Sequence, residues 1–150
     1  MLQELKYAAT WNAGQYPVVF SESDLVKMAT IYPAQLAALS DKIGSLSKGL
    51  RADLLVLRKS GTSGYAALLH AGPADVRLVV IDGVPTYGDL ELMRKLLPDK
   101  QLDSIILCGS QKGLYFNVES GSRTWKQSSE KLSAALGEWG LSLAPLTACQ

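Results

Sequence analysis

The chain has 150 residues, of which 47% are hydrophobic and 19% are charged, a balance typical of folded globular domains and not of disordered chains. Its 15 Lys and Arg residues oppose 14 Asp and Glu residues, for a net charge of +1, and like charges form no block. Nucleic acid and acidic membrane surfaces are therefore excluded as expected partners. No segment approaches the roughly 18 apolar residues of a membrane span, so we expect no membrane partner either.

Helices are predicted for the first 42 residues of the chain. Apolar residues recur every three or four positions up to Ala13, which predicts an amphipathic helix that ends at Gly14. This helix begins at the initiator methionine without a preceding cap, as though the element before it were missing. Ser21 precedes two early carboxylates, which is typical of a helix start. Pro33 would break that helix but suits the first turn of another, so a short second helix is predicted over 33–39.

Short strands and turns are predicted in the middle of the chain. The apolar run Ala52–Leu57 is suited to a buried strand, and Tyr65–Ala71 has room for one or two helical turns. Val76–Ile81 is rich in β-branched residues and is followed at once by Asp82-Gly83. This pair tolerates the positive φ angles of a two-residue turn better than any other. We therefore predict a hairpin in which Val84–Tyr87 returns antiparallel.

The last third of the sequence predicts an α/β appendage. It has a helix over Leu90–Leu97, a strand over Ser104–Cys108, a second strand over Leu114–Val118 and a closing helix. Gly140 stands where that helix needs a left-handed C-terminal cap. The predicted apolar face of the closing helix contains Trp125, Ser128, Ser129, Leu132, Leu136 and Trp139.

Two short motifs carry a resemblance to a known family. The first is Ala29-Thr30 followed by Pro33-Ala34, and the second comprises Ile43-Gly44-Ser45-Leu46, Gly49 and Ala52-Asp53-Leu54. Their order and spacing, with the hairpin after them, strongly resemble the C-terminal part of the metal-dependent amidohydrolases of the cytosine deaminase and chlorohydrolase type. The resemblance covers residues 1–97 and, more loosely, the remainder.

The resemblance implies a fold. In that family a (β/α)8 barrel carries the metal site, and a small β-sandwich is assembled from strands before and after the barrel. Residues 1–42 are then expected to be the last barrel helix and its follow-on, 43–88 the C-terminal sandwich strands and hairpin, and 89–150 the appendage, all in one compact unit. The expected class is α+β: the C-terminal part of the composite β-sandwich, flanked by helices, with a C-terminal α/β appendage.

We predict no catalytic, cofactor-binding or metal-binding residue in this chain. The family's chemistry needs a divalent metal such as zinc, which is held by histidines and a carboxylate and activates a water molecule. The resemblance implies that those ligands lie on barrel strands upstream of this chain. His70 is the only histidine in the sequence, and we expect it to have a structural role.

Cys108 and Lys112 are two further candidates for a functional site. Cys108 follows an apolar strand, and without a histidine partner it is expected to be a buried thiol and not a nucleophile. The segment Gly109–Gly113 could offer backbone N–H groups and Lys112 to an anion, but a plain hairpin loop is the simpler expectation because the spacing and following helix of a phosphate loop are missing. Turn or cap roles are expected for Asp53, Asp75 and Asp82, and core or interface roles for Trp125 and Trp139.

The expected location is the cytoplasm. Cys108 and Cys149 are too few for a disulfide framework, so free thiols in a reducing compartment are predicted. The segment Met1–Ala13 lacks the continuous apolar stretch of a secretion signal.

Three hypotheses for function follow. The first is a fragment or stand-alone remnant of an amidohydrolase that acts on non-peptide C–N bonds by metal-dependent hydrolysis or deamination; the chain alone would be inactive. The second is a non-catalytic binding or assembly module that oligomerises through the former barrel-facing surface. In both, a homo-oligomer or a partner chain is expected to cover the exposed apolar face. The third is an unrelated enzyme that uses Lys112 or Cys108.

Overall fold

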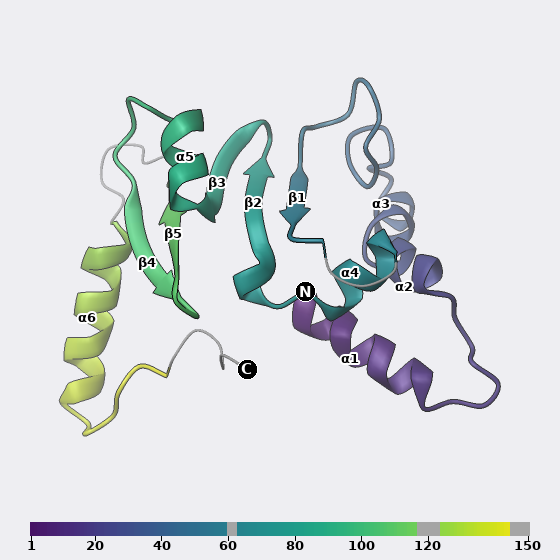
Figure 1. Cartoon of the computed structure of the whole chain (residues 1–150), viewed down its shortest axis with the longest axis horizontal. Coiled ribbons are helices and arrows are strands. Elements are labelled where there is room, and N and C mark those ends of the chain that lie inside the picture. Colours follow the sequence, from purple (N-terminus) through teal and green to yellow (C-terminus); the bar gives the residue numbers. More distant parts are fainter. Residues whose placement is uncertain (60–62, 117–123, 145–150) are drawn as a thin grey trace. The chain divides into compact units, whose positions relative to one another are not determined.

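The structure is a computed structural model that describes residues 1–59, 63–116 and 124–144. Two compact units divide the chain, Met1–Val84 and Pro85–Gln150, and each is described by itself (Figure 1). The first unit contains helices α1 (Leu2–Ala13), α2 (Glu22–Met28), α3 (Ile31–Leu36) and α4 (Gly64–His70), strands β1 (Leu54–Leu57) and β2 (Val76–Ile81), and a 3₁₀ turn over Pro73–Asp75.

Helices α1, α2 and α4 pack around a small apolar core in the first unit. Leu5, Leu25 and Leu69 each come from one of these helices, and all three side chains are buried. Alanine and phenylalanine side chains pack around them where the helices meet. The predicted amphipathic pattern of the first helix is thus confirmed, because its apolar residue at position 5 faces this core.

The buried polar residue of α1, Asn12, fixes the loop that follows the helix. Its side-chain amide donates to the carbonyl oxygen of Phe20 at 2.8 Å, and its Oδ1 accepts from the Phe20 N–H at 2.9 Å. Both hydrogen-bonding groups of one backbone unit are therefore satisfied by a single side chain. The loop between α1 and α2 is held at its far end by this pair of bonds.

Helix α2 begins with the cap that the sequence predicts. The Ser21 hydroxyl accepts from the Asp24 N–H, and the Asp24 carboxylate accepts from the Ser21 hydroxyl at 2.6 Å and from its N–H at 3.1 Å. These bonds to the ionised carboxylate lower the pKa of Asp24. Pro33 lies in the first turn of α3, as predicted, but that helix ends at Leu36, because Ala38 takes a positive φ of 55°.

Strands β1 and β2 pair antiparallel, with Leu54 opposite Val80 and Leu57 opposite Val76. The predicted two-residue turn after β2 is confirmed, since φ is 50° at Asp82 and 81° at Gly83.

The prediction that β1 is buried is wrong. Leu54, Leu55 and Val56 are 37%, 45% and 43% exposed. Only β2 pairs with this strand among the residues that the structure describes, and no described element covers both of its faces. An apolar run predicts that a strand should be buried, but it does not guarantee that the chain provides the cover.

The second unit contains two helices and three neighbouring antiparallel strands of the five-stranded sheet. Its elements are β3 (Val84–Asp89, whose first residue is assigned to the first unit), α5 (Leu90–Leu96), β4 (Asp103–Leu107), β5 (Ser110–Leu114) and α6 (Trp125–Gly137), with β5 lying between β3 and β4. Helix α5 packs directly on β5, because a Cβ atom added at Gly113 would lie 3.1 Å from the Cβ of Met93.

The connection between β4 and β5 differs from the prediction. The turn is Cys108-Gly109, with φ values of 48° and 76°, and the strand resumes at Ser110. The predicted loop Gly109–Gly113 is therefore mostly strand, and the predicted strand Leu114–Val118 begins four residues too late and extends outside the described residues. Two consecutive positive φ values close the chain in two residues, which sequence reasoning did not expect at a cysteine.

Gly140 is left-handed, with a φ of 68°, but it lies beyond the end of the closing helix α6 at Gly137, whose C-cap residue Glu138 is right-handed. The predicted apolar face of α6 does not form part of a core: none of its described residues is buried, and Leu132 and Trp139 are 50% and 82% exposed. The α+β class, with helices and antiparallel strands, is confirmed. Within the described ranges, no helix is long and apolar enough to cross a membrane.

Candidate functional site

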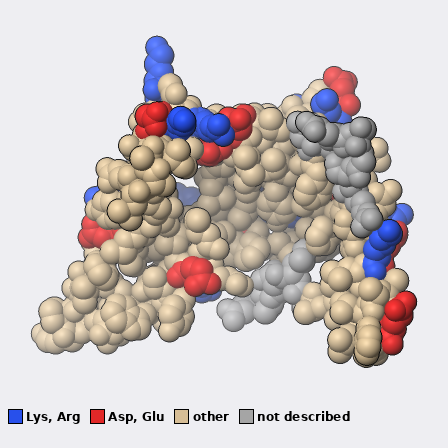
Figure 2. All heavy atoms as spheres, turned by 180° about the vertical axis from the view of Figure 1, so that it is seen from behind, with Lys and Arg blue, Asp and Glu red and all other residues tan. Residues whose placement is uncertain are grey.

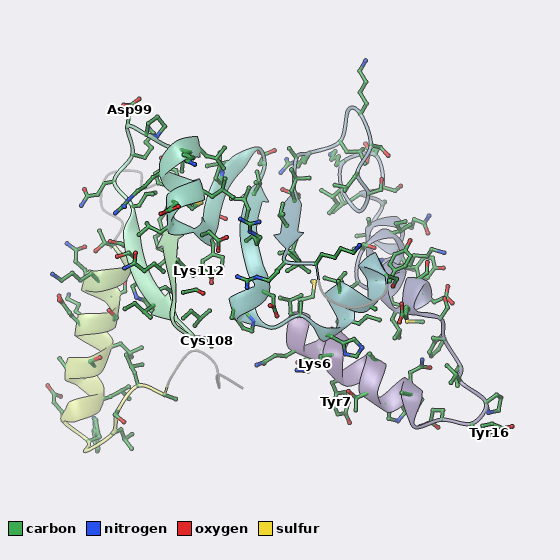
Figure 3. The ribbon with its side chains drawn as sticks, in the orientation of Figure 1. Lys6, Tyr7, Tyr16, Asp99, Cys108 and Lys112 are labelled. Carbon is green, nitrogen blue, oxygen red and sulfur yellow. The ribbon has the colours of Figure 1, made fainter. Side chains whose placement is uncertain are left out.

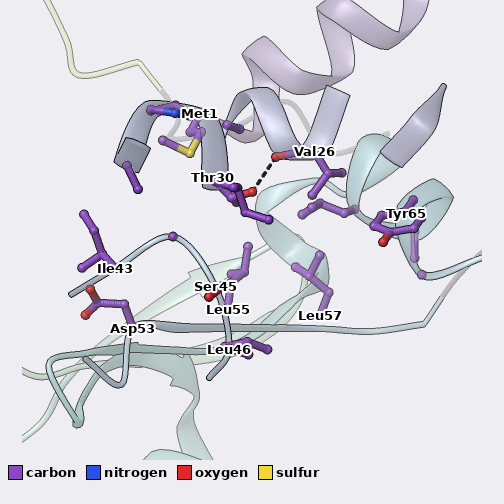
Figure 4. Close-up of a pocket in the computed structure, with 18 of the residues that line it drawn as sticks. Met1, Val26, Thr30, Ile43, Ser45, Leu46, Asp53, Leu55, Leu57 and Tyr65 are labelled. Carbon is purple, nitrogen blue, oxygen red and sulfur yellow. Dashed lines mark hydrogen bonds between the residues drawn. The ribbon is translucent and has the colours of Figure 1, made fainter. Parts of the chain in front are cut away.

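A largely apolar cavity of about 1060 Å³ opens in the first unit. Figure 4 shows Val26 and Thr30 on its helical side and Leu55 and Leu57 of β1 on the opposite side. The apolar side chains that line it include Val26, Ala29, Ile31, Pro33, Ala34, Ile43, Leu46, Leu55, Leu57 and Leu68. The lining is thus suited to apolar atoms, with few polar groups available to direct a reaction.

The two sequence motifs meet at this cavity. A Cβ atom added at Gly44 would lie 2.6 Å from the Cβ of Ala34 and 3.2 Å from the carbonyl oxygen of Thr30, so the loop rests directly on α3. Gly44 also has a φ of 100°, which side chains rarely tolerate. The Thr30 hydroxyl donates to the backbone carbonyl of Val26 in α2 at 2.8 Å, so its hydrogen bond stabilises the end of that helix (Figure 4). The motifs therefore hold a loop against a helix.

Strand β1 forms the other wall, and its flanks are cationic. Arg51 precedes the strand, Arg58 and Lys59 follow it, and all three line the cavity with exposed side chains. Asp53 is the one carboxylate among the described residues of the lining, and its Oδ1 accepts from the backbone N–H of Asp82 at 2.7 Å. Asp53 thus has the structural role that the sequence predicts, and the rim of the cavity carries more positive than negative charge.

The other carboxylates singled out in the sequence also have structural positions. Asp75 accepts from the Gly72 N–H at 2.9 Å, and Asp82 forms the turn after β2. His70 is exposed at the last residue of α4. In the described part of the chain, no group of three or more His, Cys, Asp or Glu side chains could hold a metal ion.

Lys112, the candidate for anion binding, is fully buried on β5. Its Nζ lies 2.7 Å from Oδ1 of Asp89, directly opposite it on β3 (Figure 3 labels Lys112). Tyr87 lies two residues before that carboxylate, and burial together with the charge of Asp89 raises its pKa. The anion-loop interpretation is therefore wrong, because a strand residue committed to a cross-strand ion pair is not presented to a ligand.

Cys108 is disulfide-bonded, so the prediction of a free thiol there is wrong. Cys149 lies outside the described residues. A disulfide sulfur is not a nucleophilic thiolate, which removes the hypothesis of an enzyme that uses Cys108. The predicted cytoplasmic location rested partly on free thiols and stays a prediction.

Large uncharged areas mark the surface. On the face that Figure 2 shows, most atoms belong to residues other than Lys, Arg, Asp and Glu. In the first unit, the exposed large apolar side chains include Leu36 at 89%, Leu46 at 80% and Tyr7 at 71%.

A large part of this chain is similar to known proteins. The model of the amidohydrolase family matches residues 1–99. The chain is 32% identical over 101 residues to a 5-methylthioadenosine/S-adenosylhomocysteine deaminase of Acetivibrio thermocellus, a match that covers 61% of this chain and 23% of the relative. It is 34% identical over 80 residues to a protein of the same name from Symbiobacterium thermophilum, covering 49% of this chain and 18% of the relative. The chain therefore spans less than a quarter of either relative, and no solved structure gives a significant match.

Proposed function

The chain belongs to the amidohydrolase family, and from that premise we propose that it supplies the C-terminal segment of an enzyme that acts on non-peptide C–N bonds. Both relatives are named as deaminases, and a deaminase cleaves a C–N bond. We carry over this reaction class and assign no substrate. The catalytic groups are proposed to lie on polypeptide outside these 150 residues.

One observation carries the proposal: an apolar cavity opens beside a strand whose apolar residues are exposed on both faces. A strand with the sequence Leu-Leu-Val-Leu is stabilised when both faces are covered, as in the layers of a β-sandwich. We propose that β1 and β2 form part of the composite sandwich of the family and that the remainder of the enzyme covers them. Leu46, also highly exposed, would be covered in the same way.

The residues of this chain do not fit the metal that the family implies. Catalytic zinc sites use three protein ligands, most often with two or more histidines. This sequence has a single histidine, His70, which lies at the exposed end of α4 away from the cavity lining. We therefore propose no metal ligand here and assign no catalytic step to this chain.

Reconstitution of a split enzyme tests the proposal. The purified chain is assayed with zinc for deamination of 5-methylthioadenosine and S-adenosylhomocysteine, alone and mixed with the part of the Acetivibrio thermocellus deaminase that precedes the matched segment. We expect no activity and no retained zinc for the chain alone, and activity in the mixture. A matched control carries Leu55→Glu and Leu57→Glu, which places charges in the apolar cavity and should abolish reconstitution.

Two results would count against the proposal. Deamination by the chain alone, with stoichiometric zinc, would place the active site within these residues. A mixture that forms a stable complex but stays inactive would favour a non-catalytic assembly module.

A further inference from the structure

We infer that an extended segment of another polypeptide adds to the outer edge of β1 as a β-strand, and that carboxylates at the ends of this segment meet Arg51, Arg58 and Lys59. The inference rests on the proposed function in one respect, that separate polypeptide covers the cavity. It goes beyond it by specifying how the partner binds and which charges it carries.

The backbone of β1 has a free side for such pairing. Its partner strand β2 occupies one side, from Leu54 opposite Val80 to Leu57 opposite Val76. No other described segment forms backbone hydrogen bonds with residues 54–57. An unpaired edge is a template for an added strand, which gains main-chain hydrogen bonds along the edge.

The cavity lies where one face of an added strand would need apolar contacts. Leu55 and Leu57 of β1 line it together with apolar residues of α2, α3 and the loop at Leu46. Its volume of about 1060 Å³ is at the upper end of the range for small-molecule sites, so several side chains could enter. Alternate residues of an added strand point to one face, so apolar residues at every second position fit this cavity.

The charges around the cavity favour an acidic segment over a second copy of this chain. Arg51, Arg58 and Lys59 are exposed, and Asp53, the only carboxylate that the described part of the chain contributes to the lining, is already bonded to the backbone of Asp82. Within the described ranges, none of the three cations is part of an ion pair. A second copy of this chain would bring three more cations to the same rim. A segment with acidic ends is therefore the occupant that complements this site.

A peptide pair tests the inference on the intact chain. Both peptides are about seven residues long with alternating valine and threonine; one ends in glutamate at each terminus and the other in lysine. We expect the glutamate peptide to bind about threefold to tenfold more tightly at low salt, a range expected for one or two exposed ion pairs, and the preference to fade at high salt. Hydrogen exchange should show new protection at the amides of 54–57.

Variants with reversed charges test whether the cations beside β1 cause the preference for the glutamate peptide. Arg58→Glu with Lys59→Glu should reverse the preference between the two peptides. Lys126→Glu with Lys131→Glu, which makes the same charge change on exposed residues of α6 in the second unit, should leave the preference unchanged.

Three results would overturn the inference: equal binding or no binding of the two peptides, protection that falls outside β1, or a free chain that dimerises and already protects β1. The last result would make a second copy the occupant. If the peptides behave as expected and reconstitution fails, the docking mode stands without the proposed function; if reconstitution succeeds without any peptide preference, the proposed function stands without this docking mode.

Discussion

Replacing Gly44 with alanine should destabilise the first unit more than the same change at Gly49. Both glycines have positive φ, 100° and 93°, so an alanine at either position costs about 1–2 kcal/mol in backbone strain. At Gly49 an added Cβ meets nothing within 4 Å, whereas at Gly44 it would lie 2.6 Å from the Cβ of Ala34. Overpacking of this kind adds about 1–3 kcal/mol. Gly44→Ala should thus lower the free energy of unfolding by about 2–5 kcal/mol, against about 1–2 for Gly49→Ala.

Urea unfolding followed by tryptophan fluorescence measures this difference. Trp11 is the only tryptophan of the first unit, so the variants are made in a background with Trp125→Phe and Trp139→Phe. If the m value of urea unfolding is the same in each variant, a shift in the unfolding midpoint reports a change in stability.

A double-mutant cycle isolates the contact between Gly44 and Ala34. Ala34→Gly alone should cost about 1 kcal/mol as a glycine within a helix. In the Gly44→Ala background it should cost less or become stabilising, since it removes the clashing methyl group. The remaining 3.2 Å contact with the Thr30 carbonyl should keep the recovery incomplete. Equal costs for Gly44→Ala and Gly49→Ala, or a cycle with no coupling, would refute the reasoning.

Three further predictions concern single side chains. Asn12→Ala should cost about 2–3 kcal/mol in urea unfolding, since it leaves the N–H and C=O of Phe20 without their bonds at 2.9 and 2.8 Å; a cost near zero would contradict this. Lys112→Met should cost about 1–3 kcal/mol, because it removes the buried cation that pairs with the partly exposed carboxylate of Asp89, and adding Asp89→Asn should recover more than half of the loss. The pKa of Asp24 is lowered in the folded state, so its contribution to stability is present above the ordinary carboxyl pKa of about 3.9 and is lost as the pH falls through the folded pKa. Asp24→Asn should remove that acid-dependent part of helix α2 stability, measured by circular dichroism between about pH 2 and 5; identical acid profiles would contradict it.

Local rules account for the parts of the fold that the sequence predicted. The Asp82-Gly83 turn and the Ser21 cap each depend on a few adjacent residues whose conformational preferences are strong. The Cys108-Gly109 turn was missed because cysteine carries no preference for positive φ. As a result, Lys112 was assigned to a loop when it belongs to a strand.

Properties that depend on distant residues were harder to predict. The motifs at Ala34 and Gly44 identified the family, but their mutual packing is a contact between a helix and a loop that no local pattern reveals. The hydrophobicity of β1 predicted burial, whereas exposure depends on which polypeptide lies beside it. Asn12 is a polar residue near the end of the first helix, and only the fold brings it to the backbone of Phe20.

The two-sided exposure of β1 has a consequence for the chain inside a cell. An uncapped apolar edge is the kind of feature that promotes aggregation and that chaperones and proteases encounter on unassembled proteins. The abundance of this chain would then be set less by its rate of synthesis than by the supply of whatever covers β1. Its half-life, followed after translation is stopped, should lengthen when that partner is co-expressed.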